Sequence, residues 1–224
     1  IAEETGFKVI HGIVDSLWVH KDGASDEDYQ ALAKRIEEDL GLPVSYEGRY
    51  KWIAFLLSKT NPEKPVNNRY FGVFTDGRIK YRGIEARRRD TPKMVKDMQL
   101  EMIRKLAEAN APAELQEKAL ECLEIYRKYT KKLILGEVSV KDLAITQVLS
   151  MSPEDYSVKV RHAVAAKKLE TIGIKTEPGQ AVTYIITKTA TPIQSCSRDE
   201  YNLDEYLKLL RKAMNTIIAY LNGV

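Results

Sequence analysis

Two acidic residues near the start of the chain could together do metal chemistry. Asp15 interrupts an apolar, β-branched segment at residues 7–20, and Glu47 lies in a more polar segment further along. Because an unpaired carboxylate is costly to bury, such a group is usually solvated, ion-paired or bound to a cation. Two carboxylates could hold Mg²⁺, which prefers oxygen ligands and keeps waters for substrate phosphates. For Asp15 alone, a solvated turn or a cap is the alternative.

Three basic clusters could contact nucleic-acid phosphates, since Lys and Arg supply most of that affinity. They are residues 87–89, then Arg127, Lys128, Lys131 and Lys132, and finally Arg161, Lys167 and Lys168. Glu121 and Glu124 favour a solvated helix face for the second cluster, whereas the third has fewer acidic neighbours. The net charge of +3 permits nucleic-acid binding without demonstrating it.

The histidines and cysteines show no familiar metal or nucleophile pattern. His11, His20 and His162 are far apart in the sequence, and neither Cys122 nor Cys196 has a CxxC partner. We interpret both cysteines as ordinary thiols. The sequence also has no GxSxG nucleophile elbow and no phosphate-binding P-loop.

The composition is that of a packed, soluble protein. The 224 residues are 44% hydrophobic and 30% charged, with 12 Gly and 8 Pro, which excludes collagen-like, low-complexity and disordered classes. No apolar run approaches the roughly 20 residues of a membrane-spanning helix, and the first residues lack a signal-peptide pattern. We therefore expect a cytoplasmic protein of one or two domains.

The elements that must position these side chains divide into two regions. Residues 1–91 predict a small α+β unit that begins with a buried hairpin interrupted at Gly12, followed by a helix with a capping box at Ser25 and Asp28. Strands are then expected at residues 44–47, 50–57, 69–74 and 79–84.

Residues 92–224 predict a mostly helical region. Thr91 and Pro92 are typical of a helix start, and apolar residues then recur at helical spacing. Helices are expected from Pro92, after Pro112, from Pro153 to about Ile172 and from about Asn202, with one short strand at residues 182–187.

Five segments resemble family B DNA polymerases in the order found in the archaeal enzymes. His11-Gly-Ile-Val-Asp15-Ser16 resembles the palm motif C, Tyr-Gly-Asp-Thr-Asp-Ser, which the family carries on the same hairpin. The others are residues 46–51, residues 68–70 where the family has Lys-x-Tyr, residues 80–90, and residues 162–169 together with 174–179. The resemblance implies the C-terminal part of a polymerase palm at residues 1–91 and a thumb at residues 92–224.

The resemblance also implies the roles of particular residues. Asp15 would be one carboxylate of a two-Mg²⁺ site for nucleotidyl transfer, and Glu47 a nearby helper. Tyr70 would face the primer terminus through the minor groove. The other implied DNA-binding residues are Asn68, then Arg82, Arg88 and Arg89 at the palm–thumb junction, and Tyr156, His162, Lys167 and Lys168 on the thumb. For Arg82 and Asp90, structural salt bridges within the junction are the alternative.

The family's motif A aspartate, fingers and exonuclease precede motif C, and this sequence begins shortly before it. It therefore resembles the small C-terminal polypeptide of a split archaeal polymerase of the methanogen type. Such a polypeptide would be inactive alone, would be completed in trans by a larger polypeptide, and would act on primer-template DNA and dNTPs. A truncated chain would look the same. The family's clamp-binding motif is not found at the end of the sequence, so no clamp contact is expected there.

Two positions depart from the family pattern. Ile13 stands at the other motif C aspartate, and Asn68 replaces the lysine of Lys-x-Tyr. These departures leave a second interpretation open, a non-catalytic duplex-binding or assembly subunit derived from an inactivated polymerase. A third is a helical interaction module whose likeness to polymerases is only ancestral.

Overall fold

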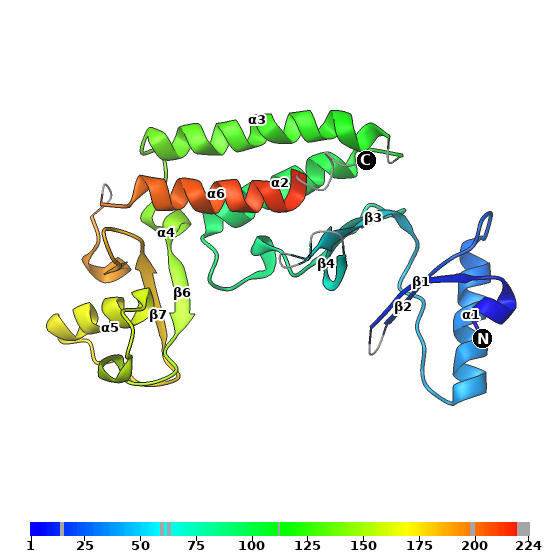
Figure 1. Cartoon of the computed structure of the whole chain (residues 1–224), viewed down its shortest axis with the longest axis horizontal. Coiled ribbons are helices and arrows are strands. Elements are labelled where there is room, and N and C mark those ends of the chain that lie inside the picture. The colour runs from blue at the N-terminus through cyan, green and yellow to red at the C-terminus, as the bar shows by residue number, and fades with distance from the viewer. Residues whose placement is uncertain (14–15, 59–60, 62–63, 112, 198–199, 219–224) are drawn as a thin grey trace. The chain divides into compact units, whose positions relative to one another are not determined.

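The chain folds into two compact units, residues 1–82 and 83–224. The computed structural model describes residues 1–13, 16–58, 61, 64–111, 113–197 and 200–218 (Figure 1). Its described strands form three antiparallel sheets, so the mixed α and β composition is as predicted. Across these residues, no helix has the length and apolarity needed to cross a membrane. The palm–thumb boundary at residues 91 and 92 stays a prediction.

The first unit begins with a short 3₁₀ turn, η1 (Glu3–Thr5), and an antiparallel hairpin of β1 (Lys8–Ile13) and β2 (Ser16–His20). The predicted hairpin is present, but Gly12 lies inside β1, where it pairs with Leu17. The hairpin is also not buried as predicted, because Ile10 and Leu17 are 49% and 47% exposed. Both apolar side chains are thus only partly covered by the described residues.

Helix α1 (Asp26–Leu40) starts at the capping box that the sequence predicts. The Ser25 hydroxyl accepts a hydrogen bond from the Asp28 N–H, and the Asp28 carboxylate accepts one from the Ser25 N–H at 2.8 Å. These two bonds satisfy backbone donors that have no partner in the first helical turn. The helix packs Leu32 against Ala2 and Phe7 in a small core.

A three-stranded sheet follows, in the order β3 (Tyr50–Leu57), β4 (Pro65–Phe74) and β5 (Ile79–Arg82). At Gly72 the strands β3 and β4 approach so closely that a Cβ atom would lie 2.9 Å from the Trp52 carbonyl oxygen. The strand predicted at residues 44–47 is wrong. Gly48, with φ of +139°, turns the chain just before β3, and side-chain contacts rather than a strand ladder hold Glu47.

Three long helices form the core of the second unit and lie side by side in Figure 1. They are α2 (Lys93–Ala107), α3 (Glu114–Ile134) and α6 (Leu203–Ile218). Periodicity predicts the buried face of α2 correctly, because Met94, Val95, Met98, Met102 and Leu106 are all buried. The 3₁₀ turn η2 (Glu85–Arg87) packs against α2.

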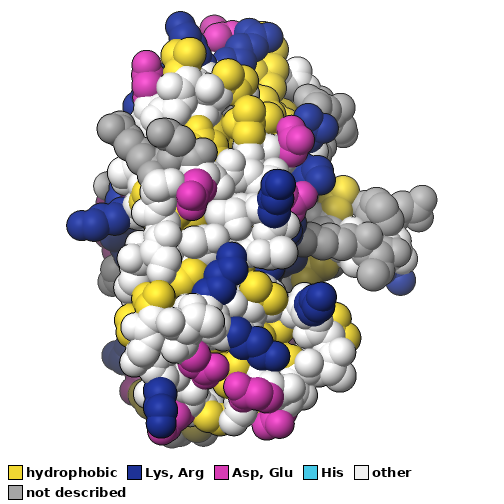
Figure 2. Space-filling view, turned by 90° about the vertical axis from the view of Figure 1, so that its left-hand side faces the viewer, with side chains coloured by type: hydrophobic (Ala, Val, Ile, Leu, Met, Phe, Trp, Pro, Cys, Tyr) yellow, Lys and Arg dark blue, Asp and Glu magenta, His cyan; other side chains and the backbone are white. Residues whose placement is uncertain are grey.

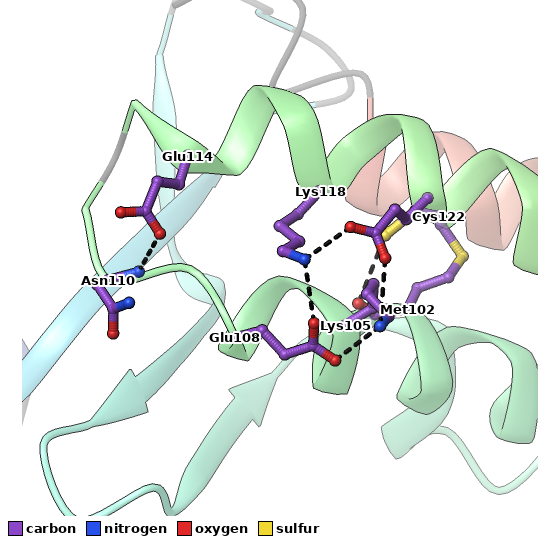
Figure 3. Close-up of polar contacts among 8 residues, drawn as sticks. Met102, Lys105, Glu108, Asn110, Glu114, Lys118 and Cys122 are labelled. Carbon is purple, nitrogen blue, oxygen red and sulfur yellow. Dashed lines mark hydrogen bonds and ion pairs between the residues drawn. The ribbon is translucent and has the colours of Figure 1, made fainter.

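Ion pairs among four charged side chains join the end of α2 to α3 (Figure 3). Lys118 Nζ lies 2.6 Å from Glu121 and 3.1 Å from Glu108, and Lys105 Nζ lies 2.7 Å from Glu108 and 3.2 Å from Glu121. These hydrogen bonds raise the pKa of both lysines and lower the pKa of both glutamates. Both lysine charges are therefore neutralised within the turn.

The remaining elements form a small sheet covered by one helix. Helix α5 (Arg161–Thr171) packs on the sheet strands β7 (Ala181–Ile185) and β8 (Thr191–Pro192). The other elements are α4 (Val140–Leu143), β6 (Ile145–Val148), η3 (Pro153–Asp155) and η4 (Ile193–Ser195).

The helix predicted from Pro153 to about Ile172 is wrong in its first half. Only η3 and α5 are helical there, and the Val160 N–H donates to the Val158 carbonyl at 2.8 Å in a tight turn between them. Val158, in this turn, is 68% exposed, so burial of its side chain does not favour a helix there.

Candidate nucleic-acid interface

The predicted metal ligand Asp15 lies outside the described residues. In the chain it falls between Ile13, where β1 ends, and Ser16, where β2 begins. Its metal role stays a prediction.

Glu47 is held by basic side chains of the same unit. Its carboxylate oxygens lie 2.5 and 2.6 Å from Lys80 Nζ, and its carbonyl oxygen accepts a hydrogen bond from Arg78 at 2.9 Å. Within the described part of the chain, no group of three or more His, Cys, Asp or Glu side chains could hold a metal ion. The described residues therefore do not fit a Mg²⁺ site by themselves.

Tyr70 packs within an aromatic cluster of the first unit. Its side chain is 1% exposed, and its ring centroid lies 5.7 Å from that of Trp18 and 5.8 Å from that of Phe55. His11 lies 5.0 Å from the rings of both Trp18 and Phe55. The four aromatic rings join the β1–β2 hairpin to the β3–β4 pair, an arrangement that the sequence did not reveal.

Asn68 and Arg82 are exposed residues of the same sheet that carries Tyr70. Asn68 lies on β4, and Arg82 ends β5 with its Cα paired to that of Tyr70. The structure thus brings these three predicted residues to one part of one sheet, where Asn68 and Arg82 are accessible and Tyr70 is buried.

The arginines at residues 87–89 follow η2 in the second unit and are exposed. Arg88 donates through Nε and a terminal nitrogen to the two carboxylate oxygens of Asp90, at 2.9 and 2.8 Å. This two-pronged bond raises the pKa of Arg88 and lowers the pKa of Asp90. Asp90 therefore forms a salt bridge within this segment, which is the structural role given above as the alternative for Asp90. This salt bridge orients the Arg88 guanidinium.

Tyr156 and His162 belong to a hydrogen-bonded chain that crosses from η3 to the sheet. The Tyr156 hydroxyl accepts from the Ser150 N–H at 2.9 Å and lies 3.2 Å from His162 Nε2. His162 Nδ1 lies 3.1 Å from Gln147 Oε1, which also accepts from the Tyr184 hydroxyl at 2.7 Å.

The partners of His162 assign its tautomer. An amide oxygen can only accept, so Nδ1 carries the proton toward Gln147 and the neutral ring's Nε2 accepts from the Tyr156 hydroxyl. Partial burial lowers the pKa of His162, which favours this neutral form. Burial raises the pKa of Tyr156, but the hydrogen bonds from Ser150 and Met151 outweigh it and lower the pKa.

Tyr156 also lines a hollow of about 290 Å³ beside α5. Lys159, Lys167 and Lys168 line the same hollow, and Lys168 Nζ donates to Thr191 Oγ1 at 3.3 Å. The other lining residues are Pro153, Val158, Ala163, Val164 and Thr171. Three predicted thumb residues thus meet at one place, with His162 bonded to Tyr156. Sequence reasoning missed Lys159, which the expected continuous helix would have placed differently.

Other basic residues are engaged by carboxylates. Arg127 pairs with Glu124 and Lys128 with Glu101 on the helical face, in agreement with the solvated interpretation of the second cluster. Arg161, from the third cluster, pairs with Glu205 at 2.6 Å. On the face shown in Figure 2, Lys and Arg side chains lie among Asp, Glu and hydrophobic ones rather than forming a field of one sign.

Comparison with known proteins gives consistent matches. The family described as DNA polymerase family B matches residues 1–221. DNA polymerase 2 of Aeropyrum pernix is 29% identical over 213 residues, covering 92% of this chain and 24% of that protein. The DNA polymerase of Archaeoglobus fulgidus is 31% identical over 188 residues, covering 84% of this chain and 22% of that protein.

A solved structure is similar over almost the whole chain. The family B DNA polymerase from Pyrobaculum calidifontis matches with a TM-score of 0.67 and 26% identity, covering 96% of this chain and 27% of that one. The chain thus spans about a quarter of the length of the relatives it matches. Because the family match extends over residues 1–221, this chain belongs to DNA polymerase family B.

Proposed function

We propose that this chain is the C-terminal palm segment and thumb of a DNA-directed DNA polymerase. The palm segment is residues 1–91, and the thumb is residues 92–224. The observation that carries the proposal is the family match over residues 1–221, which includes the segment around Asp15 that resembles motif C. The substrates are then primer-template DNA and dNTPs.

The thumb would bind duplex DNA through its backbone. Lys159 and Lys167 are exposed beside the hollow that Tyr156 lines, and the arginines at residues 87–89 are exposed after η2. Lys and Arg side chains at such positions neutralise phosphates and fix the register of a duplex without reading its sequence. A polymerase needs binding of this kind, because it must act on any template.

In this proposal, Asp15 supplies one carboxylate to a two-Mg²⁺ site that is completed in trans. Metal ions in such a site stabilise the attacking and leaving oxygens of nucleotidyl transfer. Glu47 is already bound to Lys80, so we assign it to positioning Lys80 rather than to holding metal.

A larger polypeptide would supply the exonuclease, motif A and fingers. Two features of the first unit support a protein partner. Val9, Ile10 and Leu17 of the hairpin are between 38% and 49% exposed, and a hollow of about 750 Å³ is lined by the hairpin, α1 and residues 43–53. Exposed apolar surface of this kind marks protein interaction sites.

The test is primer extension by the chain together with the larger polypeptide that co-purifies with it. Asp15→Asn should reduce Mg²⁺-dependent incorporation at least 100-fold while leaving the assembly intact on gel filtration. Asp22→Asn, at a fully exposed position, is the matched control and should leave extension unchanged. Undiminished extension by Asp15→Asn, or extension by the isolated chain, would refute the proposal.

The second candidate is a non-catalytic duplex-binding or assembly subunit. The Glu47–Lys80 ion pair and the apolar Ile13 at an expected aspartate favour it. The same assay distinguishes the two candidates. A non-catalytic subunit would bind primer-template DNA, and Asp15→Asn would leave primer extension by its complex unchanged.

A further inference from the structure

Gln99 is fully buried on α2, and every part of its amide makes a hydrogen bond. Its Oε1 accepts from the Ala86 N–H at 2.6 Å, and its Nε2 donates to Glu85 Oε2 and to the Ala213 carbonyl, each at 3.0 Å. A buried amide is costly unless it is hydrogen-bonded, and here each of its polar atoms has a partner that an apolar residue would leave unpaired. The amide is therefore suited to holding its partners in place.

The three partners lie on two separate elements. Glu85 and Ala86 belong to η2, and Ala213 belongs to α6, so Gln99 joins η2 to the helical core from α2. Glu85 is itself only 7% exposed. A short 3₁₀ turn has little stability of its own, so these buried bonds, together with its packing on α2, hold η2 in place.

The three arginines at residues 87–89 directly follow Ala86 in the sequence. The Arg88 N–H donates to the Glu85 carbonyl at 3.0 Å, and the Arg88 side chain is bound to Asp90. A continuous series of bonds therefore runs from buried Gln99 through Glu85 to exposed Arg88. Fixing a cationic segment before it binds lowers the entropy lost on binding.

We propose that Gln99 is a positioning residue that preorganises the arginines at residues 87–89 for contact with DNA phosphates. The inference rests on the proposed function. Gln99 touches no DNA and acts through Glu85 and Ala86.

The test measures duplex affinity of the full chain against salt concentration. Each phosphate contact contributes about 0.9 to the slope of log affinity against log salt. Gln99→Met keeps the side-chain size and removes the bonds, so we expect the slope to fall by about 1 to 2. Leu106→Ala, a buried change near the C-terminal end of α2, should lower the melting temperature but leave the slope unchanged.

A second variant covers the case in which Gln99→Met fails to fold. Glu85→Leu combined with Gln99→Met removes the buried amide and its carboxylate partner together, which costs less stability than leaving that carboxylate unpaired. This double variant should recover folding, since it leaves no buried carboxylate unpaired, and still show the reduced slope because Ala86 is no longer held.

The arginines themselves separate this inference from the proposed function. Arg87→Ala with Arg89→Ala should lower the slope in the wild-type chain but change it little further in the Gln99→Met or double-variant background. If the arginine change leaves the wild-type slope unaltered, the DNA contact at this segment is refuted. If it lowers the slope equally in all backgrounds, or if the Gln99 variants keep the wild-type slope, the positioning role is refuted and the DNA contact stands.

Discussion

His162 Nε2 and the Tyr156 hydroxyl lie 3.2 Å apart, with the two rings edge to face at 84°. Through this contact Tyr156, which lines the hollow, is bonded to His162 of α5, and His162 is bonded in turn to Gln147 of β6. The position of Tyr156 therefore depends on a ring that gains a proton as the pH falls, and partial burial lowers the pKa at which it does so.

Acid should weaken the second unit through His162. Burial lowers its pKa below the ordinary value of about 6.5, so the folded state binds fewer protons than the unfolded state. The stabilisation is then present above about pH 6.5 and is lost as the pH falls through the folded-state pKa. In His162→Gln, the melting temperature, measured by circular dichroism, should change less between pH 7 and pH 5 than in the wild-type chain. His20→Gln, at a position 59% exposed, should keep the wild-type dependence.

Lys167 should contribute to duplex binding, and Lys118 should not. Lys167 is exposed beside the hollow, so Lys167→Ala should reduce the salt slope of duplex affinity by about 0.9. Lys118 is bound to two glutamates, so Lys118→Ala should leave the slope as it is. Fluorescence anisotropy over a salt series measures both, and equal slopes for the two variants would contradict the assignment of the interface.

Glu47→Gln should have a small effect on stability and none on metal use. The Glu47–Lys80 pair is partly exposed, and pairs of this kind contribute up to about 1 kcal/mol. In the assembled enzyme, the Mg²⁺ concentration that gives half-maximal primer extension should stay at the wild-type value. A several-fold rise would show instead that Glu47 holds metal.

Ile10→Lys should weaken assembly with the larger polypeptide while leaving the fold intact. Ile10 is 49% exposed on β1, so the added charge costs the isolated chain less than about 0.5 kcal/mol. Titration calorimetry should show weaker binding to the partner. Leu120→Lys, at a 66% exposed position on α3, is the matched control. Unchanged binding by Ile10→Lys would place the partner elsewhere.

Local patterns in the sequence predicted much of the fold. The Ser25–Asp28 capping box and the apolar stripe of α2 depend on residues three or four apart, and both are present. The strand at residues 44–47 was wrong because Lys80 and Arg78, more than thirty residues away, hold Glu47 outside any ladder. Strand β6 was missed because its four residues are too few to show a period.

The sequence predicted the charged residues of the candidate interface, but it did not predict residues whose role depends on long-range contacts. Lys167 and Lys168 stand out in the sequence as a basic pair, and they meet Tyr156 at one hollow. Gln99 gave no signal, because a single glutamine in an amphipathic helix is ordinary until Glu85 and Ala213 are seen beside it. Asp15 was identified by resemblance, and its role stays a prediction.

The close approach of β3 and β4 at Gly72 affects the aromatic cluster around Tyr70, because Phe55 and Tyr70 of that cluster lie on these two strands. A methyl group there would meet the Trp52 carbonyl and the Ile53 Cα at 2.9 and 3.1 Å, so even alanine would push β3 and β4 apart. Phe55 and Tyr70 sit opposite each other on those strands and hold the hairpin through Trp18. The absence of a side chain at this one position thus permits the close β3–β4 pairing to which the β1–β2 hairpin is anchored.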